Sequence, residues 1–150
     1  MNSKALLLGV DPGSSKTGVA LLTDAGEIEN TEVLLMTDFA GALAEFLGGR
    51  EIKLCILGNG TTSVKMKVVL GQFLPQAEIV IVDEAHSTEE ARKLYWQLNP
   101  PKGLRKLFPL WMQVPPVNLD GLAAAVLVRR YLQKNVANSA NRCYNKPVDY

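Results

Sequence analysis

The sequence predicts an α/β domain with a mixed five-stranded sheet flanked by helices. Two observations lead to this fold class. Three apolar segments separated only by short turns occupy the first 36 residues, and two further apolar segments then alternate with stretches of helical period. Consecutive strands with short turns form an antiparallel meander, whereas strands separated by helices add in parallel. At 150 residues, 47% of them hydrophobic, the chain has the size of one domain.

Turn residues separate the first three expected strands. Apolar residues at 5–11 and 17–22 predict two buried strands, with the turn Pro12-Gly13-Ser14-Ser15 between them. A second turn at 24–26 precedes a third strand at about 27–36. These three segments form the expected meander.

The period then becomes helical. Phe39, Leu43 and Phe46 have the spacing of one helix face, and Gly48-Gly49 predicts the end of that helix. The next expected elements are a strand at 53–57, a helix at about 63–74, a strand at 78–82 and a helix at about 87–98. The two strands complete a five-stranded sheet.

A proline-rich stretch at 99–118 separates the last two expected helices. Loops of this length within a domain are usually functional, so we expect an arm on a domain that spans 1–134. The last helix is expected at about 119–134. Residues 135–150 are polar, and we expect an irregular tail there.

The net charge of +1 hides an asymmetry. From Arg92 to Lys146 there are ten basic residues and one acid, a net +9, whereas from Met1 to Pro75 there are six basic and eight acidic residues, a net −2. Such one-sided basicity is typical of a surface that binds a polyanion. A solvated helix face followed by a basic tail explains it equally well.

Hydropathy and the number of cysteines indicate where in the cell the protein is expected. No apolar run approaches the roughly 20 residues of a membrane span, and the N-terminus has no signal-peptide pattern. The two cysteines, Cys55 and Cys143, do not suggest a disulfide framework or a zinc site. We therefore expect a cytoplasmic protein without a membrane partner.

Three carboxylates stand at the ends of predicted elements, namely Asp11, Glu84 and Asp120. Ionised carboxylates beside apolar strands cost several kcal/mol unless they are paired or bound to metal, so the pattern predicts one acidic site for Mg²⁺ or Mn²⁺. Each acid has another explanation. Asp11 could cap the following turn, Asp120 could cap its helix, and Asp83 could take the place of Glu84.

Further polar residues are candidates for binding substrate phosphates. The turn after Asp11 offers a glycine backbone, hydroxyls and an ammonium group, although it lacks the order of a Walker P-loop. Thr88 either positions the loop after Glu84 or shares helix capping with Ser87. The complete set of candidate substrate-binding residues is Gly13, Ser14, Lys16, Thr88, Lys102, Arg105 and Lys106.

Three segments resemble the RuvX/YqgF family of Holliday junction resolvases and pre-16S rRNA processing nucleases. They are LGVDPGSSKTGVA at 8–20, VDEAHSTEEAR at 82–92 and LDGLAAAVL at 119–127. The resemblance implies an RNase H-like fold and a divalent-metal-dependent endonuclease. Its substrate would be branched DNA or structured RNA, with roles in DNA recombination or in rRNA processing and ribosome biogenesis. Asp11, Glu84 and Asp120 would be both metal ligands and catalytic residues.

One departure from the family pattern and one wider similarity motivate other functions. Ala85 and His86 stand where the family usually has Arg-Leu, which favours a catalytically weak nucleic-acid-binding or assembly module. Kinase-like ATP-binding proteins share the RNase H-like core and also place Asp-x-Gly-Ser/Thr after the first strand. One domain is less than such kinases need to enclose a nucleotide, so that alternative ranks last. A homodimer is also possible.

Overall fold

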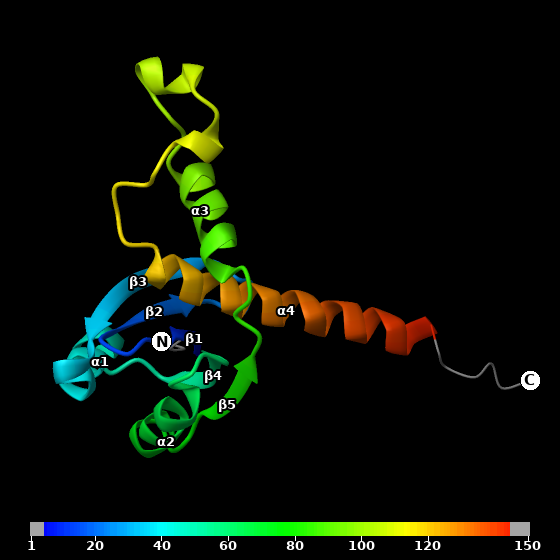
Figure 1. Cartoon of the computed structure of the whole chain (residues 1–150). Coiled ribbons are helices and arrows are strands. Elements are labelled where there is room, and N and C mark those ends of the chain that lie inside the picture. The colour runs from blue at the N-terminus through cyan, green and yellow to red at the C-terminus, as the bar shows by residue number, and fades with distance from the viewer. Residues whose placement is uncertain (1–4, 145–150) are drawn as a thin grey trace, which may run out of the picture.

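The structure is a computed structural model that describes residues 5–144, with side chains described as far as residue 140. Its centre is a sheet of five strands in the order β3-β2-β1-β4-β5, drawn in Figure 1. β1 pairs antiparallel with β2, and β2 with β3, whereas β4 and β5 are added in parallel. The mixed five-stranded α/β sheet is therefore confirmed. The strands are β1 (Leu6–Asp11), β2 (Lys16–Leu22), β3 (Ile28–Leu35), β4 (Ile52–Gly58) and β5 (Glu78–Val82).

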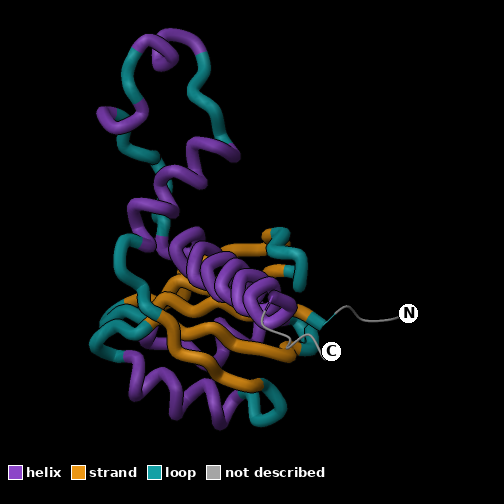
Figure 2. Tube along the Cα trace, turned by 90° about the vertical axis from the view of Figure 1, so that its right-hand side faces the viewer, coloured by secondary structure: helices purple, strands orange, loops and turns teal. Residues whose placement is uncertain are grey.

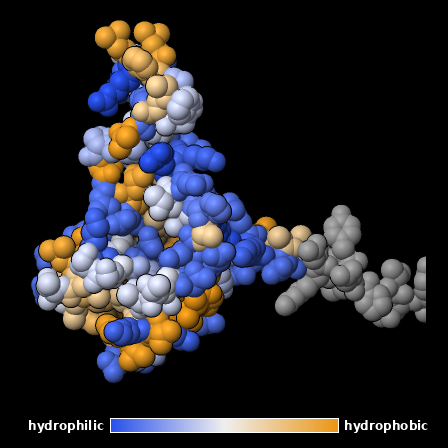
Figure 3. All heavy atoms as spheres, viewed as in Figure 1, coloured by the Kyte–Doolittle hydropathy of each residue, from blue (hydrophilic) through white to orange (hydrophobic). Residues whose placement is uncertain are grey.

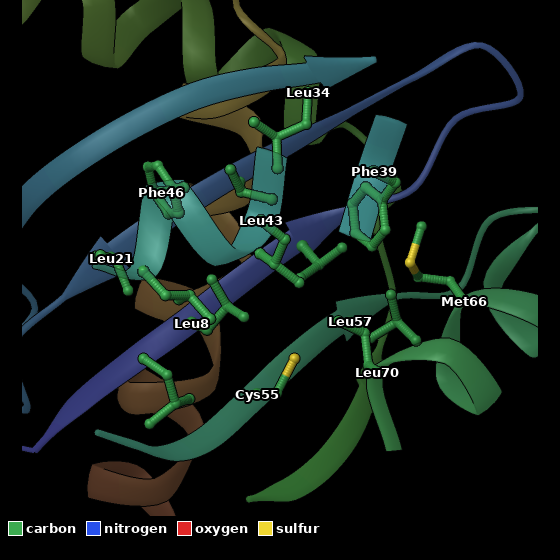
Figure 4. Packing of buried hydrophobic residues seen from close by; sticks show 14 of the residues in the cluster. Leu8, Leu21, Leu34, Phe39, Leu43, Phe46, Cys55, Leu57, Met66 and Leu70 are labelled. Atoms are coloured by element: carbon green, nitrogen blue, oxygen red, sulfur yellow. The ribbon is translucent and has the colours of Figure 1, made fainter. Parts of the chain in front are cut away.

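Helices cover both faces of this sheet, and the central strand β1 is buried on both sides. Leu8 and Val10 belong to the core that includes residues of α1 and α2, whereas Leu7 belongs to the core under α4. Figure 4 shows the first of these cores, and Figure 2 shows α4 lying across the opposite face. The four α-helices are α1 (Phe39–Leu47), α2 (Ser63–Phe73), α3 (Ser87–Leu98) and α4 (Asp120–Tyr144).

The approach of α4 to the sheet depends on small residues. A Cβ on Gly9 of β1 would collide with the carbonyl oxygen of Ala124 and would lie 2.8 Å from Val128 Cγ2. The facing part of α4 is also small, because Ala123, Ala124 and Ala125 are all fully buried or nearly so. Backbone therefore packs almost directly on backbone between β1 and α4.

Helix α3 packs on α4 rather than on the sheet. Ala91 and Leu94 of α3 form a small buried cluster with Ala123 and Val126 of α4. The proline-rich stretch follows α3 and contains two 3₁₀ turns, η2 (Gly103–Leu107) and η3 (Leu110–Met112). It forms an arm that projects away from the sheet, as Figures 1 and 2 show.

The last helix is longer than predicted. We expected it to end near Lys134, but α4 continues to Tyr144, so most of the expected irregular tail is helical. Residues 135–144 contain no Gly or Pro to end a helix, and the side chains at 135–140 are exposed. Ser139 Oγ donates to the carbonyl oxygen of Asn135 one turn earlier. Residues 145–150 lie outside the described residues, and the division into a domain at 1–134 and a tail at 135–150 stays a prediction.

The described helices include none whose length and hydropathy would let it cross a membrane.

Replacing Gly9 with Ala tests the close packing of α4 on β1. The added methyl group has no free space, so we expect Gly9→Ala to lower the free energy of unfolding by about 1–3 kcal/mol. Gly71→Ala is the matched control, because the nearest atom to its new methyl group would be Ile79 Cδ1 at 4.0 Å and the position is in a helix. That variant should gain about 0.5–1 kcal/mol. Urea unfolding of both proteins measures the difference, and equal effects would contradict the packing described.

Candidate functional site

The candidate site lies at the edge of the sheet where the parallel strands β1, β4 and β5 end. Asp11 is the last residue of β1, and Glu84 comes two residues after the end of β5. Carboxyl ends of neighbouring parallel strands meet at one edge, which is where open α/β sheets usually bind ligands. The topology therefore brings residues that are 73 positions apart in the sequence to one place.

Glycines at the end of β4 and just after it make room for the Glu84 carboxylate. A Cβ on Gly58 would lie 2.5 Å from Glu84 Oε2, and one on Gly60 would lie 2.7 Å from Glu84 Oε1. Between them, Asn59 Oδ1 accepts a hydrogen bond from the Glu84 backbone N–H at 3.2 Å, while the Asn59 N–H donates to the carbonyl of Val82 at 3.0 Å. Sequence reasoning did not assign a role to Gly58, Asn59 and Gly60, although their Gly-x-Gly spacing was the available signal.

The structure decides between the two neighbouring acids after β5. Asp83 Oδ1 accepts a hydrogen bond from the Ala85 backbone N–H at 3.0 Å, so its carboxylate caps the local turn. The Glu84 carboxylate instead lies against Gly58 and Gly60 at the end of β4, and its negative charge acts on Asp11. Glu84 is therefore the acid that faces the site.

Asp120 reaches the same region because α4 begins beside β2. Gly18 is paired with Asp11 across the sheet, and a Cβ on Gly18 would collide with the Asp120 carbonyl oxygen. Asn118 Oδ1 caps the start of α4 by accepting from the Asp120 N–H at 2.9 Å. Gly18 is thus a second residue whose role sequence reasoning missed, since it lets Asp11 and Asp120 share one corner of the fold.

The acid cluster is electrostatically strained. The pKa of the Asp11 carboxyl is raised to about 7, first by burial, then by the negative charges of Glu84 and Asp120, and also by the hydrogen bond with Glu84. Glu84 Oε2 is buried, and no N–H or hydroxyl group of the described chain donates to it. A cation bound here would relieve the repulsion that raises the pKa of Asp11.

The donor chemistry of the acid pair suits magnesium that carries a phosphate ligand. Mg²⁺ is usually held by one or two carboxylates together with substrate phosphates and water rather than by a cage of protein ligands. Over residues 5–144, no group of three or more His, Cys, Asp or Glu side chains is arranged to hold a metal ion. The roles of Asp11, Glu84 and Asp120 as metal ligands therefore stay predictions.

The turn after Asp11 places the candidate phosphate-binding groups beside the acids. A Cβ on Gly13 would collide with the Lys16 carbonyl oxygen, so the turn is tight, and Ser14 and Ser15 are exposed at its tip. Lys16 Nζ lies 3.7 Å from Asp120 Oδ2, with both side chains well exposed. An ion pair of this kind contributes little to stability, so Lys16 can exchange partners readily.

The other predicted substrate-binding residues lie on α3 and on the arm. Thr88 is exposed in the first turn of α3, and its role stays a prediction. Lys102, Arg105 and Lys106 lie on the arm, which points away from the sheet in Figures 1 and 2.

Arg130 connects the elements around the site. Its guanidinium donates to Glu90 Oε1 at 2.8 Å and to the carbonyl oxygen of Asp83 at 3.1 Å. The hydrogen bond from Arg130 also lowers the pKa of Glu90. Arg130 therefore links α4 to α3 and to the loop that carries Glu84, which is a positioning role.

Comparisons with known proteins were made for the whole chain. No family model and no curated protein matches it. Among solved structures, it is similar to a ROK family protein from Streptococcus pneumoniae in complex with sucrose, at 14% identity and a TM-score of 0.42 over 63% of this chain and 39% of that one. It is also similar to a ROK family glucokinase from Streptomyces griseus in complex with glucose and AMPPNP, at 14% identity and a TM-score of 0.40 over 66% of this chain and 38% of that one.

The chain thus spans about two-fifths of the length of these structures. A third similar structure is a ROK family transcriptional regulator, a homologue of the E. coli MLC protein, at 10% identity and a TM-score of 0.44, with 63% of this chain and 31% of that one covered. With TM-scores below 0.5, these likenesses assign neither an activity nor a ligand to this chain.

The comparisons correct several expectations. The assignment to the RuvX/YqgF family was wrong, because no family model matches the chain and the similar structures are ROK family proteins that include a glucokinase. The predictions that depended on this assignment were also wrong. They are the metal-dependent endonuclease, its hydrolase activity in recombination or rRNA processing, and branched DNA or structured RNA as the partner. The three motifs behind the resemblance are short, and they occur where the fold itself demands turns and helix starts.

The raised pKa of Asp11 predicts how stability depends on pH. Its folded-state pKa of about 7 exceeds the ordinary value of 3.8, so the folded protein binds the proton more tightly and loses stability as pH rises from about 4 to about 7. Asn cannot titrate, so Asp11→Asn should lack this loss. In metal-free buffer at about pH 8, it should be more stable than the parent by roughly 1–2 kcal/mol, a value discounted for partial exposure.

Urea unfolding across this pH range, with Glu45→Gln as an exposed control on α1, measures the effect. Identical pH profiles for the parent and Asp11→Asn would show that the carboxyl is not strained.

Proposed function

We propose that this chain is a kinase-like ATP-binding domain that holds the Mg²⁺-bound phosphates of a nucleoside triphosphate. The observation that carries the proposal is the Asp11–Glu84 carboxyl pair, whose buried Glu84 Oε2 receives no hydrogen bond from the described chain. A divalent cation would relieve the strain in this pair. Mg²⁺ is usually held by one or two carboxylates together with substrate phosphates, so a cation that brings its own phosphate ligands suits this pair.

The residues around the acid pair would bind different parts of the Mg²⁺-bound phosphate. Asp11 and Glu84 would hold the cation, which would neutralise the phosphate charge and orient the phosphate group. The turn formed by Gly13, Ser14 and Ser15 offers backbone N–H groups and hydroxyls to the phosphate oxygens, and the Lys16 ammonium offers positive charge. Lys16 would exchange its exposed pairing with Asp120 for the phosphate at little cost.

We also propose that the sheet belongs to the RNase H-like fold, which kinase-like ATP-binding proteins share. The support is the antiparallel meander of β1, β2 and β3, followed by the parallel strands β4 and β5 with helices between them. Such kinases enclose the nucleotide between two related domains. The residues described here supply one side of such a site, so the proposal is for binding, and phosphoryl transfer would need a second domain or partner.

Titration calorimetry with ATP tests the proposal. Binding should require Mg²⁺ and should disappear with EDTA, and Glu84→Gln should weaken it about tenfold or more because one of two cation ligands is lost. Asp83→Asn is a closely matched control, since the neighbouring acid caps a local turn and should leave binding unchanged.

Lys16→Ala separates the roles further, because it should weaken ATP binding without changing the affinity for Mg²⁺ alone. ATP binding of equal affinity with and without Mg²⁺, or an unchanged affinity in Glu84→Gln, would contradict the proposal.

A further inference from the structure

The arm between α3 and α4 exposes large apolar side chains to solvent. Leu104, Leu107, Trp111 and Val114 are each more than three-quarters exposed, although residues of these types are usually buried. Figure 3 shows hydrophobic residues gathered at the end of the arm. Soluble proteins rarely expose apolar clusters of this kind unless the cluster binds something.

A pocket lies where the arm returns towards α3. It has a volume of about 610 Å³ and is lined by Glu89, Arg92, Lys93 and Trp96 from one face of α3 and by Leu110 and Trp111 from η3. Two indole rings thus wall a cavity that Arg92 and Lys93 border with positive charge. This volume accommodates a bulky apolar side chain or a ligand of similar size.

The surface around the pocket is one-sided in charge. Residues 91–119 contain five Lys and Arg and no Asp or Glu, a net charge of +5. Of the two acids just before this segment, Glu90 pairs with Arg130, whereas Glu89 is exposed and lines the pocket beside Arg92 and Lys93, so the basic residues still outnumber the free acid. A complementary partner must therefore be acidic as well as apolar.

We propose that the arm and the adjoining face of α3 form a docking surface for an acidic protein segment. One bulky apolar side chain of that segment would insert between Trp96 and Trp111, and its carboxylates would face Arg92, Lys93 and the basic residues of the arm. Buried aromatic and arginine residues are the usual anchors of such interfaces. This surface lies apart from the acid pair, so the inference is independent of the proposed ATP binding.

Other occupants fit less well. A second copy that docked arm against arm would bring two surfaces of charge +5 together. A lipid bilayer presents no protruding group to fill a concave pocket, and a small molecule in the pocket would leave the apolar tip of the arm uncovered. An acidic segment with apolar side chains would fill the pocket, cover the apolar tip of the arm and neutralise the basic residues.

Fluorescence polarisation with designed peptides tests the inference on the full chain. The probe is a labelled peptide in which Glu residues alternate with Leu and Trp, and we expect it to bind with an affinity that falls as salt rises. Two matched peptides, one with Ala for Leu and Trp and one with Lys for Glu, should bind about tenfold more weakly or worse. Equal binding of all three peptides, or no binding of the first, would overturn the inference.

Paired variants locate the binding. Trp111→Ala combined with Lys93→Ala should weaken the acidic probe about tenfold, and the fold should be unaffected because Trp111 is largely exposed. Val64→Ala combined with Lys65→Ala removes an exposed apolar and an exposed basic side chain from α2 and should change nothing.

Sedimentation with vesicles containing phosphatidylserine, and sedimentation velocity of the protein alone, examine the other occupants. Vesicle binding or dimerisation that Trp111→Ala abolishes, without binding of the acidic peptide, would overturn the inference.

Discussion

The close packing of α4 on β1 and β2 is the constraint on which the rest of the structure depends. Gly9 and Gly18 let the helix backbone reach the strands, and the start of α4 then holds Asp120 next to Asp11. Helix α3 is placed in turn, because it packs on α4 and is tied to it through the Arg130–Glu90 pair. The arm extends from α3, so its direction also follows from where α4 lies.

The site brings negatively charged side chains together, and their mutual repulsion does not stabilise the fold. Burial and neighbouring charges raise the pKa of Asp11 to about 7, and the loop at Gly58 and Gly60 has room for a glutamate that no donor of the described chain satisfies. Stability alone would favour an apolar or amide side chain at these positions. The strain therefore points to a ligand that supplies positive charge, and a Mg²⁺-bound phosphate is the ligand that also suits the neighbouring turn.

Sequence reasoning predicted the sheet well, because hydrophobic period and turn residues act locally. It ended α4 too early, since a polar and exposed helix gives no periodic signal. It placed Asp11, Glu84 and Asp120 at element ends and favoured Glu84, but it left Asp83 open as the alternative, because the sequence does not show that Asp83 caps the local turn. The family resemblance misled because it rested on three short segments, one of which is a tight turn in which a Cβ on Gly13 would collide with the Lys16 carbonyl oxygen.

Crystals grown with Mn²⁺ and a non-hydrolysable ATP analogue would test the central claim most directly, because anomalous scattering locates Mn²⁺ without ambiguity. The account predicts an anomalous peak bound by Asp11 and Glu84, with phosphate oxygens completing its coordination and the turn at Gly13 contacting the same phosphate. A nucleotide bound elsewhere, or a bound nucleotide with no Mn²⁺ at Asp11 and Glu84, would contradict the proposal.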